Sequence, residues 1–427
     1  MESNRKGIAI IGAGLAGLTA AYFIRRLRRD LPITIFEASE RQGGRVYTST
    51  VPPGEHGARY LLKSELNVGP GCDYWRDYAL PDGRNVGELF RELKIRIAEI
   101  GERDWPYCCI LKSQTIVRLD PSGKKLKQQF PFAADVIGGL ERDLPRAQGK
   151  FTNWLKHKGR HDKPSLKILK MILAGETSAP WTHLSAQYAL QCLASTVDAK
   201  EEWLTVKKNT GTLIEALAAS SAGRIKQGST CLKVRKVGHQ TVDVTYSNKT
   251  GIRKSAFEGV IISSPDGQSL IRSRSNRRHY HSYISILLEC SEKPTLQTKP
   301  KADLRDGLYT DDRLVNYLEA SPTKKGRWVL RILVPNADEL VHWSDKQIEG
   351  RCIKVLTRLK MNGKPHISPS IKRWKIGLPC GGTSCKYEEV SGRIYLCGDR
   401  YGRWPSMAAA IVSGATAADA LLANLSL

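Results

Sequence analysis

The sequence predicts an α/β protein that starts on a parallel sheet, and three features near its N-terminus predict it. Residues 8 to 11 form a short apolar run of the kind found in a buried parallel strand. A G-x-G-x-x-G spacing follows at once, formed by Gly12, Gly14 and Gly17. A second apolar run, residues 33 to 36, ends at Glu37. This order of strand, turn, helix, strand and carboxylate indicates a Rossmann-like dinucleotide-binding unit.

Each glycine of this motif has its own physical task. Gly12 allows a tight turn, Gly14 lets the backbone approach a pyrophosphate, and Gly17 lets the helix pack closely on the strand. Leu15 and Ala16 open the helix, whose free N–H groups and positive end would meet the phosphates. The helix face that follows is small and then apolar at helical spacing, as a helix lying on a sheet requires.

The residues after the second strand indicate which dinucleotide binds. Glu37 lies 20 residues after Gly17, where a carboxylate can accept both ribose hydroxyls of an adenosine, and Ala38 follows it. Gly43 and Gly44 would bring a second stretch of backbone near the pyrophosphate, and Arg45 would supply a charge-assisted donor. A NAD-binding Rossmann domain with a chance Gly-Gly turn is the alternative.

The segment from Glu37 to Arg45 resembles the second glycine pair of the flavin amine oxidase superfamily, which includes amine and amino-acid oxidases, protoporphyrinogen oxidases, phytoene desaturases and renalase-like proteins. Residues 371 to 379, 392 to 399 and 404 to 414 resemble three later motifs of that superfamily. The resemblance implies a Rossmann-like FAD-binding domain of the glutathione-reductase type with an inserted α+β substrate domain. The FAD-binding domain would comprise 1–80, 205–267 and 371–427, and the substrate domain 81–204 and 268–370.

The resemblance also implies roles for single residues. Asp399, after Gly398, would contact the ribityl or pyrophosphate oxygens, and the strand around Val234 would place backbone amides against the adenine. Ser406 and Met407 would begin a helix whose N-terminus faces flavin O2, where reduction places negative charge. The absence of a cysteine in an S-G-G-C context predicts that FAD is bound non-covalently.

Two tryptophans and two serines mark the expected substrate side. Trp374 and Trp404 are expected beside the isoalloxazine ring, with two core tryptophans as the alternative. Monoamine-type relatives use a lysine near flavin N5 and two aromatic side chains that line the path of the amine. Alignment by eye places Ser285 at the position of the lysine and Ser406 at the position of one of these aromatic residues. These two departures predict that simple monoamines are poor substrates.

His56 belongs to a segment, Glu55 to Tyr60, that resembles the stretch passing beside the flavin. The sequence shows no base or metal partner for this histidine, so a local hydrogen-bonding role is favoured over catalysis.

Composition limits the remaining possibilities. With 427 residues, 41% hydrophobic and 26% charged, the chain should fold into two or three ordinary domains. Ten cysteines without C-x-x-C pairs indicate reduced cytoplasmic thiols, with Cys108-Cys109 and Cys380…Cys385 as alternative redox pairs. No uncharged apolar run approaches ~18 residues, so no membrane span is expected. The net charge of +25 is spread along the chain, which favours a cationic surface over a specific nucleic-acid site.

The chemistry that remains is hydride transfer to flavin N5. The donor is a C–H beside nitrogen in an amine or amino acid, and molecular oxygen reoxidises the flavin to give hydrogen peroxide. A C–C dehydrogenase of the protoporphyrinogen or carotenoid type and a non-catalytic flavoprotein scaffold are the alternatives. The cationic surface would draw an anionic small-molecule substrate. The oligomeric state stays open.

Overall fold

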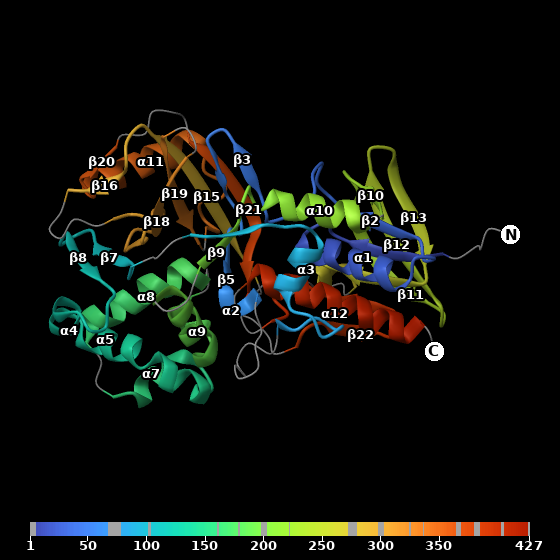
Figure 1. Cartoon of the computed structure of the whole chain (residues 1–427), viewed down its shortest axis with the longest axis horizontal. Coiled ribbons are helices and arrows are strands. Elements are labelled where there is room, and N and C mark those ends of the chain that lie inside the picture. Colours follow the sequence, from blue (N-terminus) through green and yellow to red (C-terminus); the bar gives the residue numbers. More distant parts are fainter. Residues whose placement is uncertain are drawn as a thin grey trace.

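The computed structural model describes residues 6–66, 78–100, 104–159, 162–177, 180–197, 203–221, 223–271, 280–297, 303–323, 326–335, 337–363, 369–379, 385–402 and 405–425. Figure 1 shows two lobes, of which one holds α1, β2 and α12 and lies on the side where both chain ends are marked. The other lobe holds a large sheet and most of the remaining helices.

The lobe with both chain ends is built on a six-stranded sheet. Its order is β10 (Arg224–Lys226), β2 (Ile33–Phe36), β1 (Ile8–Ile11), β14 (Gly259–Ile262), β23 (Ile394–Leu396) and β22 (Glu388–Ser391). The first five strands are parallel, and β22 joins the edge antiparallel. Three separate stretches of sequence thus contribute strands to one sheet.

Alternate residues of each central strand serve two different cores, because successive side chains of a strand point to opposite faces. Ile8 and Ile10 pack against α1 (Leu15–Leu27), α10 (Gly211–Ser221) and α12 (Met407–Leu425). Ala9 and Ile11 pack against an antiparallel meander formed by β11 (Thr230–Val237), β12 (Thr241–Asn248) and β13 (Gly251–Phe257). The continuous apolar run of β1 therefore reflects burial on both faces.

The last helix, α12, lies close against α1. A Cβ at Gly414 would overlap the carbonyl oxygen of Ala16, so only glycine allows this approach. By length and composition, α12 is the one helix of the described chain that could span a membrane, and 67% of its apolar window is buried inside the protein. Burial of this kind is what a core helix needs, and α12 supplies much of the core on which the parallel sheet rests.

The second lobe is built on a seven-stranded sheet. Its order is β21 (Ser370–Pro379), β15 (Tyr280–Cys290), β19 (Trp328–Val334), β18 (Tyr317–Pro322), β17 (Leu308–Thr310), β7 (Tyr107–Ile110) and β8 (Thr115–Arg118). All neighbours are antiparallel except the parallel pair β7 and β17. One face packs on α11 (Asp345–Arg358). A separate core joins α4 (Lys124–Gln129), α5 (Pro131–Gly138), α6 (Leu140–Asp143), α7 (Phe151–His157), α8 (Lys163–Thr177) and α9 (Ala186–Val197).

Shorter elements connect the two lobes. One small sheet has the order β5 (Tyr60–Leu62), β9 (Trp203–Val206) and β6 (Ile97–Glu99), and α2 (Lys63–Leu66) follows β5. Two short antiparallel pairs lie outside these sheets: β3 (Thr48–Thr50) with β4 (Pro53–Glu55), and β16 (Thr295–Leu296) with β20 (Met361–Asn362).

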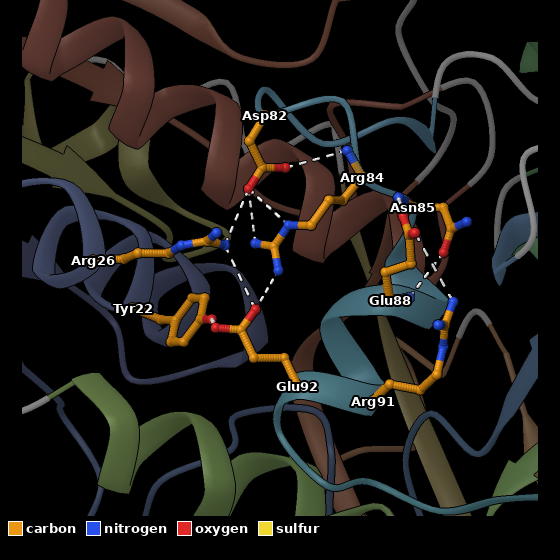
Figure 2. A network of polar contacts seen from close by, with 8 residues as sticks. All are labelled: Tyr22, Arg26, Asp82, Arg84, Asn85, Glu88, Arg91 and Glu92. Atoms are coloured by element: carbon orange, nitrogen blue, oxygen red, sulfur yellow. Dashed lines mark hydrogen bonds and ion pairs between the residues drawn. The ribbon is translucent and has the colours of Figure 1, made fainter.

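A polar network fixes α3 (Val86–Glu92) against α1 (Figure 2). Arg26 of α1 lies 3.1 Å from Asp82, and the Nε of Arg84 donates to the same carboxylate at 2.8 Å. The Tyr22 hydroxyl donates to Glu92, and burial raises the pKa of Tyr22 to about 12. A capping box of Asn85 and Glu88 starts α3.

Candidate active site

The glycine-rich turn has the geometry that the sequence predicted. Gly12 has φ +104° and donates its N–H to the carbonyl of Phe36 at 2.7 Å. A Cβ at Gly17 would overlap the carbonyl oxygen of Gly12, so the helix can begin here only with glycine at this position. Leu15 and Ala16 are almost fully buried, which leaves their backbone N–H groups as the parts able to meet a phosphate.

The second glycine pair lies directly beside this turn. Gly14 and Gly43 form a parallel bridge, and the N–H of Gly43 donates to the carbonyl of Ala13 at 2.8 Å. Gly43 and Gly44 have φ values of +100° and +55°, which favour glycine. A Cβ at Gly14 would meet nothing within 4 Å, so the start of α1 has open space in front of it. Two glycine segments around free space at a helix N-terminus fit the pyrophosphate of a dinucleotide.

Glu37 is held in place at the same turn. Its Oε2 accepts from the N–H of Ala13 at 2.8 Å, and its Oε1 accepts from the N–H and hydroxyl of Ser39 at 2.9 and 2.7 Å. Ala38, between them, is exposed. The sequence did not identify Ser39, which orients the carboxylate proposed to bind the ribose.

Arg45 and Asp399, which the sequence assigned separately to FAD, bind each other. The two guanidinium Nη atoms donate to the two carboxylate oxygens at 2.8 Å each, and Nη1 also donates to the carbonyl of Gly377 at 2.9 Å. Burial acts to lower the pKa of Arg45, but Asp399 and Tyr280 together raise it above its ordinary value. Gly398, at φ +141°, donates its N–H to the Ser413 hydroxyl at 2.9 Å. The pair joins the Gly-Gly turn to the C-terminal motif.

The remaining cofactor candidates come from β11 and α12. Val234 points its side chain into the core, and β11 is an edge strand of its sheet, which suits a backbone contact. Ser406 caps α12, since its hydroxyl accepts from the N–H of Ala409 at 3.1 Å, and Met407 is the buried first residue of the helix. Trp404 lies outside the described residues.

One face of the seven-stranded sheet is polar, and it gathers the predicted substrate-side residues. Cross-strand partners share a face, so the register places Trp374 opposite Tyr283, Lys372 opposite Ser285, and Glu319 opposite Arg331. The ring centres of Trp374 and Tyr283 are 5.6 Å apart, and Trp374 is partly exposed. The opposite face carries the apolar core.

The segment from Gly54 to Tyr60 runs along this polar face. His56 is fully buried, with Nδ1 3.2 Å from the hydroxyl of Ser285 and Nε2 2.9 Å from that of Ser370. Burial lowers the pKa of His56 to about 4, and the charge of Arg331 adds to the effect. His56 is therefore neutral at pH 7, and its contacts match the local hydrogen-bonding role that the sequence favoured.

The structure identifies a lysine side chain, that of Lys372, which the sequence alignment missed. Ser285 is buried and bonded to His56, whereas Lys372 on the neighbouring strand places its Nζ 4.8 Å from the centre of the Tyr47 ring. Arg41 lies over the same ring at 4.6 Å. Burial and the charge of Arg41 lower the pKa of Lys372. Its position opposite Ser285 follows from strand register, which a single sequence does not show.

A second buried group of charges was also missed. Glu319 is 1% exposed, and its Oε1 accepts from Arg59 Nη1 at 2.7 Å and from the Tyr60 hydroxyl. Arg331 is 6% exposed and donates through Nη2 to the carbonyl of Gly57 at 2.6 Å. The available signal was a charge in each of two apolar strands, Tyr317–Pro322 and Trp328–Val334, because charges are rarely buried without a partner.

Neither a metal centre nor a thiol site emerges from the described residues. They contain no group of three or more His, Cys, Asp or Glu placed to hold a metal ion. Burial raises the pKa of Cys109 to about 12 and that of Cys108 well above its usual value, which disfavours a reactive thiolate. The other candidate thiol pair includes Cys380, which lies outside the described residues.

Comparison with known proteins identifies the class. The pattern of the family described as flavin containing amine oxidoreductase matches residues 15–422, so the chain belongs to that family. It is an FAD-dependent oxidoreductase. The glycine turns around open space in front of α1 fit this cofactor.

Individual relatives match shorter stretches. A coproporphyrinogen III oxidase of Staphylococcus aureus is 51% identical over 75 residues, which is 16% of each chain. An L-amino-acid oxidase of Naja atra is 31% identical over 121 residues, 28% of this chain and 21% of the relative. The structure of cyclohexylamine oxidase from Brevibacterium oxydans IH-35A aligns with a TM-score of 0.71 at 14% identity, covering 99% of this chain and all of that one, which shows a shared fold.

Proposed function

We propose that the protein is an FAD-dependent oxidase that removes a hydride from the carbon beside nitrogen in an amine or amino-acid-type substrate. Bound FAD would accept the hydride at N5 and pass the electrons to molecular oxygen, giving hydrogen peroxide. The observation that carries the proposal is the polar face of the seven-stranded sheet. Its charges and hydroxyls meet the segment 54–60, which lies against the Gly-Gly-Arg turn.

In this proposal one discontinuous domain binds FAD and the other binds the substrate. A glutathione-reductase-type FAD-binding domain would comprise 1–80, 205–267 and 371–427, with 81–204 and 268–370 forming the substrate domain. The carboxylate of Glu37 would bind the adenosine ribose, and the N-terminus of α1 would bind the pyrophosphate. Trp374 would line the substrate side and, with the polar face of the sheet, orient the substrate and exclude water.

A C–C dehydrogenase acting on a porphyrinogen is the second candidate. The coproporphyrinogen III oxidase match favours it. The described substrate side carries two arginines, two glutamates and several tyrosines, which can bind the polar groups of an amino compound and equally the acidic side chains of a porphyrinogen. The reduction screen described next therefore decides between the two reactions.

An anaerobic reduction screen tests the proposal. The FAD-loaded protein is mixed with amines, amino acids and reduced porphyrins, and bleaching of the flavin near ~450 nm is followed. We expect rapid bleaching by at least one amino compound, followed by peroxide formation when oxygen is admitted. Bleaching by porphyrinogens alone would establish the second candidate instead.

A further inference from the structure

The antiparallel meander of β11, β12 and β13 has one buried face and one outer face. Val234, Val244 and Phe257 of the buried face belong to the core that packs on the parallel sheet. Because successive side chains of a strand point to opposite faces, the residues that alternate with them form the outer face. Figure 1 shows the meander at the end of the molecule farther from the second lobe, so it lies away from the proposed substrate side.

The outer face of the meander is basic. The register places Lys233 and Lys254 in one row across the three strands, and Arg235 opposite Asp243 in the next row. Lys6 adds a further charge, since its Nζ lies 3.2 Å from the hydroxyl of the first residue of β12. Asp243 forms an ion pair with Lys254 at 2.7 Å. Four positive charges therefore share this face with one negative charge.

The sequence of the meander has the same bias. Residues 230–257, all of which the structure describes, contain six lysines and arginines but a single acidic residue, Asp243. The lysines and arginines of this segment are all exposed. An excess of five positive charges within one small sheet makes this part of the surface strongly attractive to anions.

Aliphatic side chains are exposed at both ends of the basic area. Val237 and Ile252 belong to the outer face by register and are 44% and 71% exposed. Leu232, at the bulge of β11, is 45% exposed. These three are half of the six large hydrophobic side chains that are exposed in the described parts of the chain. Single exposed aliphatic residues are ordinary, but a group of them on one small sheet indicates an interaction surface.

Protection of the sheet edges explains only part of this composition. Lysines on edge strands prevent pairing with other chains, and β11 and β13 are both edge strands. That role does not explain the exposed aliphatic side chains, which favour association. Basic and aliphatic side chains together suit an anionic lipid bilayer. The cations attract the headgroups, and the aliphatic groups enter the boundary between headgroups and acyl chains.

Nucleic acid fits this face less well. Proteins that bind single strands stack the bases on aromatic side chains, whereas Tyr246 and Phe257, the aromatic residues of the segment 230–257, belong to the buried core. The phosphates of a duplex would use the charges and leave the aliphatic side chains without a partner. A bilayer surface uses both.

We propose that the outer face of the β11–β13 meander binds the surface of an anionic lipid bilayer. Lys233, Arg235 and Lys254 contact the headgroups, and Val237 and Ile252 enter the interface. The protein binds from one side and inserts no helix, because α12 stays in its core. This inference goes beyond the proposed function and does not depend on the identity of the substrate.

Co-sedimentation of the FAD-loaded full chain with vesicles tests the proposal. Vesicles of phosphatidylcholine are compared with vesicles that also contain roughly 30% phosphatidylserine. The lipid concentration for half-maximal binding should be at least ~10-fold lower with phosphatidylserine, and about 0.5 M sodium chloride should release the protein. Equal binding to both kinds of vesicle, or binding to neither, would overturn the proposal.

A pair of charge variants assigns the binding to this face. Lys233→Gln combined with Arg235→Gln should raise the lipid concentration for half-maximal binding at least ~10-fold. Lys346→Gln combined with Arg358→Gln, at exposed positions of α11 in the second lobe, removes the same charge and should change binding less than ~2-fold. Equal weakening in both double variants would show that the total charge of the protein holds the vesicle, and the proposal would be wrong.

A matched pair of isoleucines tests the aliphatic contact. Ile252→Ser should weaken vesicle binding several-fold, and Ile353→Ser, at a side chain 49% exposed on α11, should leave it unchanged. Flavin absorbance and melting temperature show that each variant is folded, and Ile252→Ser carries the test if the charge variant does not fold. Vesicle binding by Ile252→Ser equal to that of the parent protein would refute the proposal.

A DNA duplex separates the lipid from the other polyanion. Ile252→Ser should leave any binding to the duplex unchanged, because such binding depends on charge alone. A protein that binds the duplex through Lys233 and Arg235 but does not bind the vesicles would make this face a nucleic-acid site and overturn the lipid proposal. None of these outcomes depends on which compound reduces the flavin, so the proposed oxidase activity is tested separately.

Discussion

Gly14 and Gly17 belong to one motif, but they are glycines for different reasons. A Cβ at Gly17 would overlap the carbonyl of Gly12, whereas a Cβ at Gly14 would meet nothing within 4 Å. Gly17 is required by the packing of the protein itself, and Gly14 leaves room for the cofactor.

This contrast gives a paired prediction. Gly17→Ala should destabilise the FAD-free protein by roughly 1–3 kcal/mol, because the backbone must shift to admit the methyl group. Gly14→Ala should leave the melting temperature of the FAD-free protein unchanged and weaken FAD binding. Thermal melts without FAD and FAD titration measure both effects, and equal melting temperatures of the two FAD-free variants would contradict the assignment.

His56 should make the protein sensitive to acid. Its pKa is about 4 in the folded protein, against about 6.5 for the ordinary side chain. Between these values the unfolded chain binds a proton that the folded protein does not, so stability falls as pH falls from 6.5 to 4 and is fully present above 6.5. The difference corresponds to ~3 kcal/mol.

Urea denaturation across this range measures the effect. His56→Gln should flatten the dependence of unfolding free energy on pH between 6.5 and 4. His239→Gln, at an exposed position in the β11–β12 turn, should keep the slope of the parent protein. An unchanged slope in His56→Gln would show that other groups cause the acid sensitivity.

Trp374 should affect turnover more than stability. It is partly exposed, and its ring contact with Tyr283 survives in Trp374→Phe. We expect an altered rate of flavin reduction with bound FAD and melting temperature nearly unchanged. A core tryptophan would instead lose about 1–3 kcal/mol of stability, so a large fall in melting temperature at unchanged turnover would refute the assignment.

At the scale of elements, the Arg45–Asp399 pair joins the second glycine turn to the segment before α12. Its two hydrogen bonds are both 2.8 Å long, and the side chains are 26% and 16% exposed. A double-mutant cycle with Arg45→Ala and Asp399→Ala on FAD-free protein should give a coupling of about 1–3 kcal/mol.

The chain offers an exposed pair as a control for this cycle. Arg313 and Glu339 are 3.2 Å apart with side chains 87% and 82% exposed, and their coupling should stay below about 1 kcal/mol. Equal couplings for the two pairs would show that Arg45 and Asp399 are not structurally joined in solution and meet only the cofactor.

The elements of the parallel sheet could be predicted from sequence because their signals are local. The strand–turn–helix pattern of residues 8–27 and the second strand at 33–36 form as expected. The polar face could not be predicted, because it depends on register: Glu319 meets Arg331 only through the β18–β19 pairing, and Arg59 comes from a distant segment. Strand register also explains why Lys372 was not predicted. Alignment by eye pointed to Ser285, and only the β15–β21 pairing shows that Lys372 lies opposite it.

At the scale of the whole molecule, the net charge of +25 should steer substrates by their own charge. Screening lengths fall from about 10 Å at 0.1 M salt to about 3 Å at 1 M, so long-range attraction is lost as salt rises. A cationic protein attracts anions and repels cationic amines over this range.

Stopped-flow reduction at low substrate concentration tests this steering. Raising sodium chloride from about 0.05 to 0.5 M should lower the second-order rate constant several-fold for a substrate with net negative charge, such as a dicarboxylic amino acid, because attraction is screened. For a cationic amine the constant should rise or stay level. The limiting rate at saturating substrate should change little, since salt acts on encounter rather than on hydride transfer. A fall of equal size for both substrates would mean that salt acts on the site itself and not on the field of the whole protein.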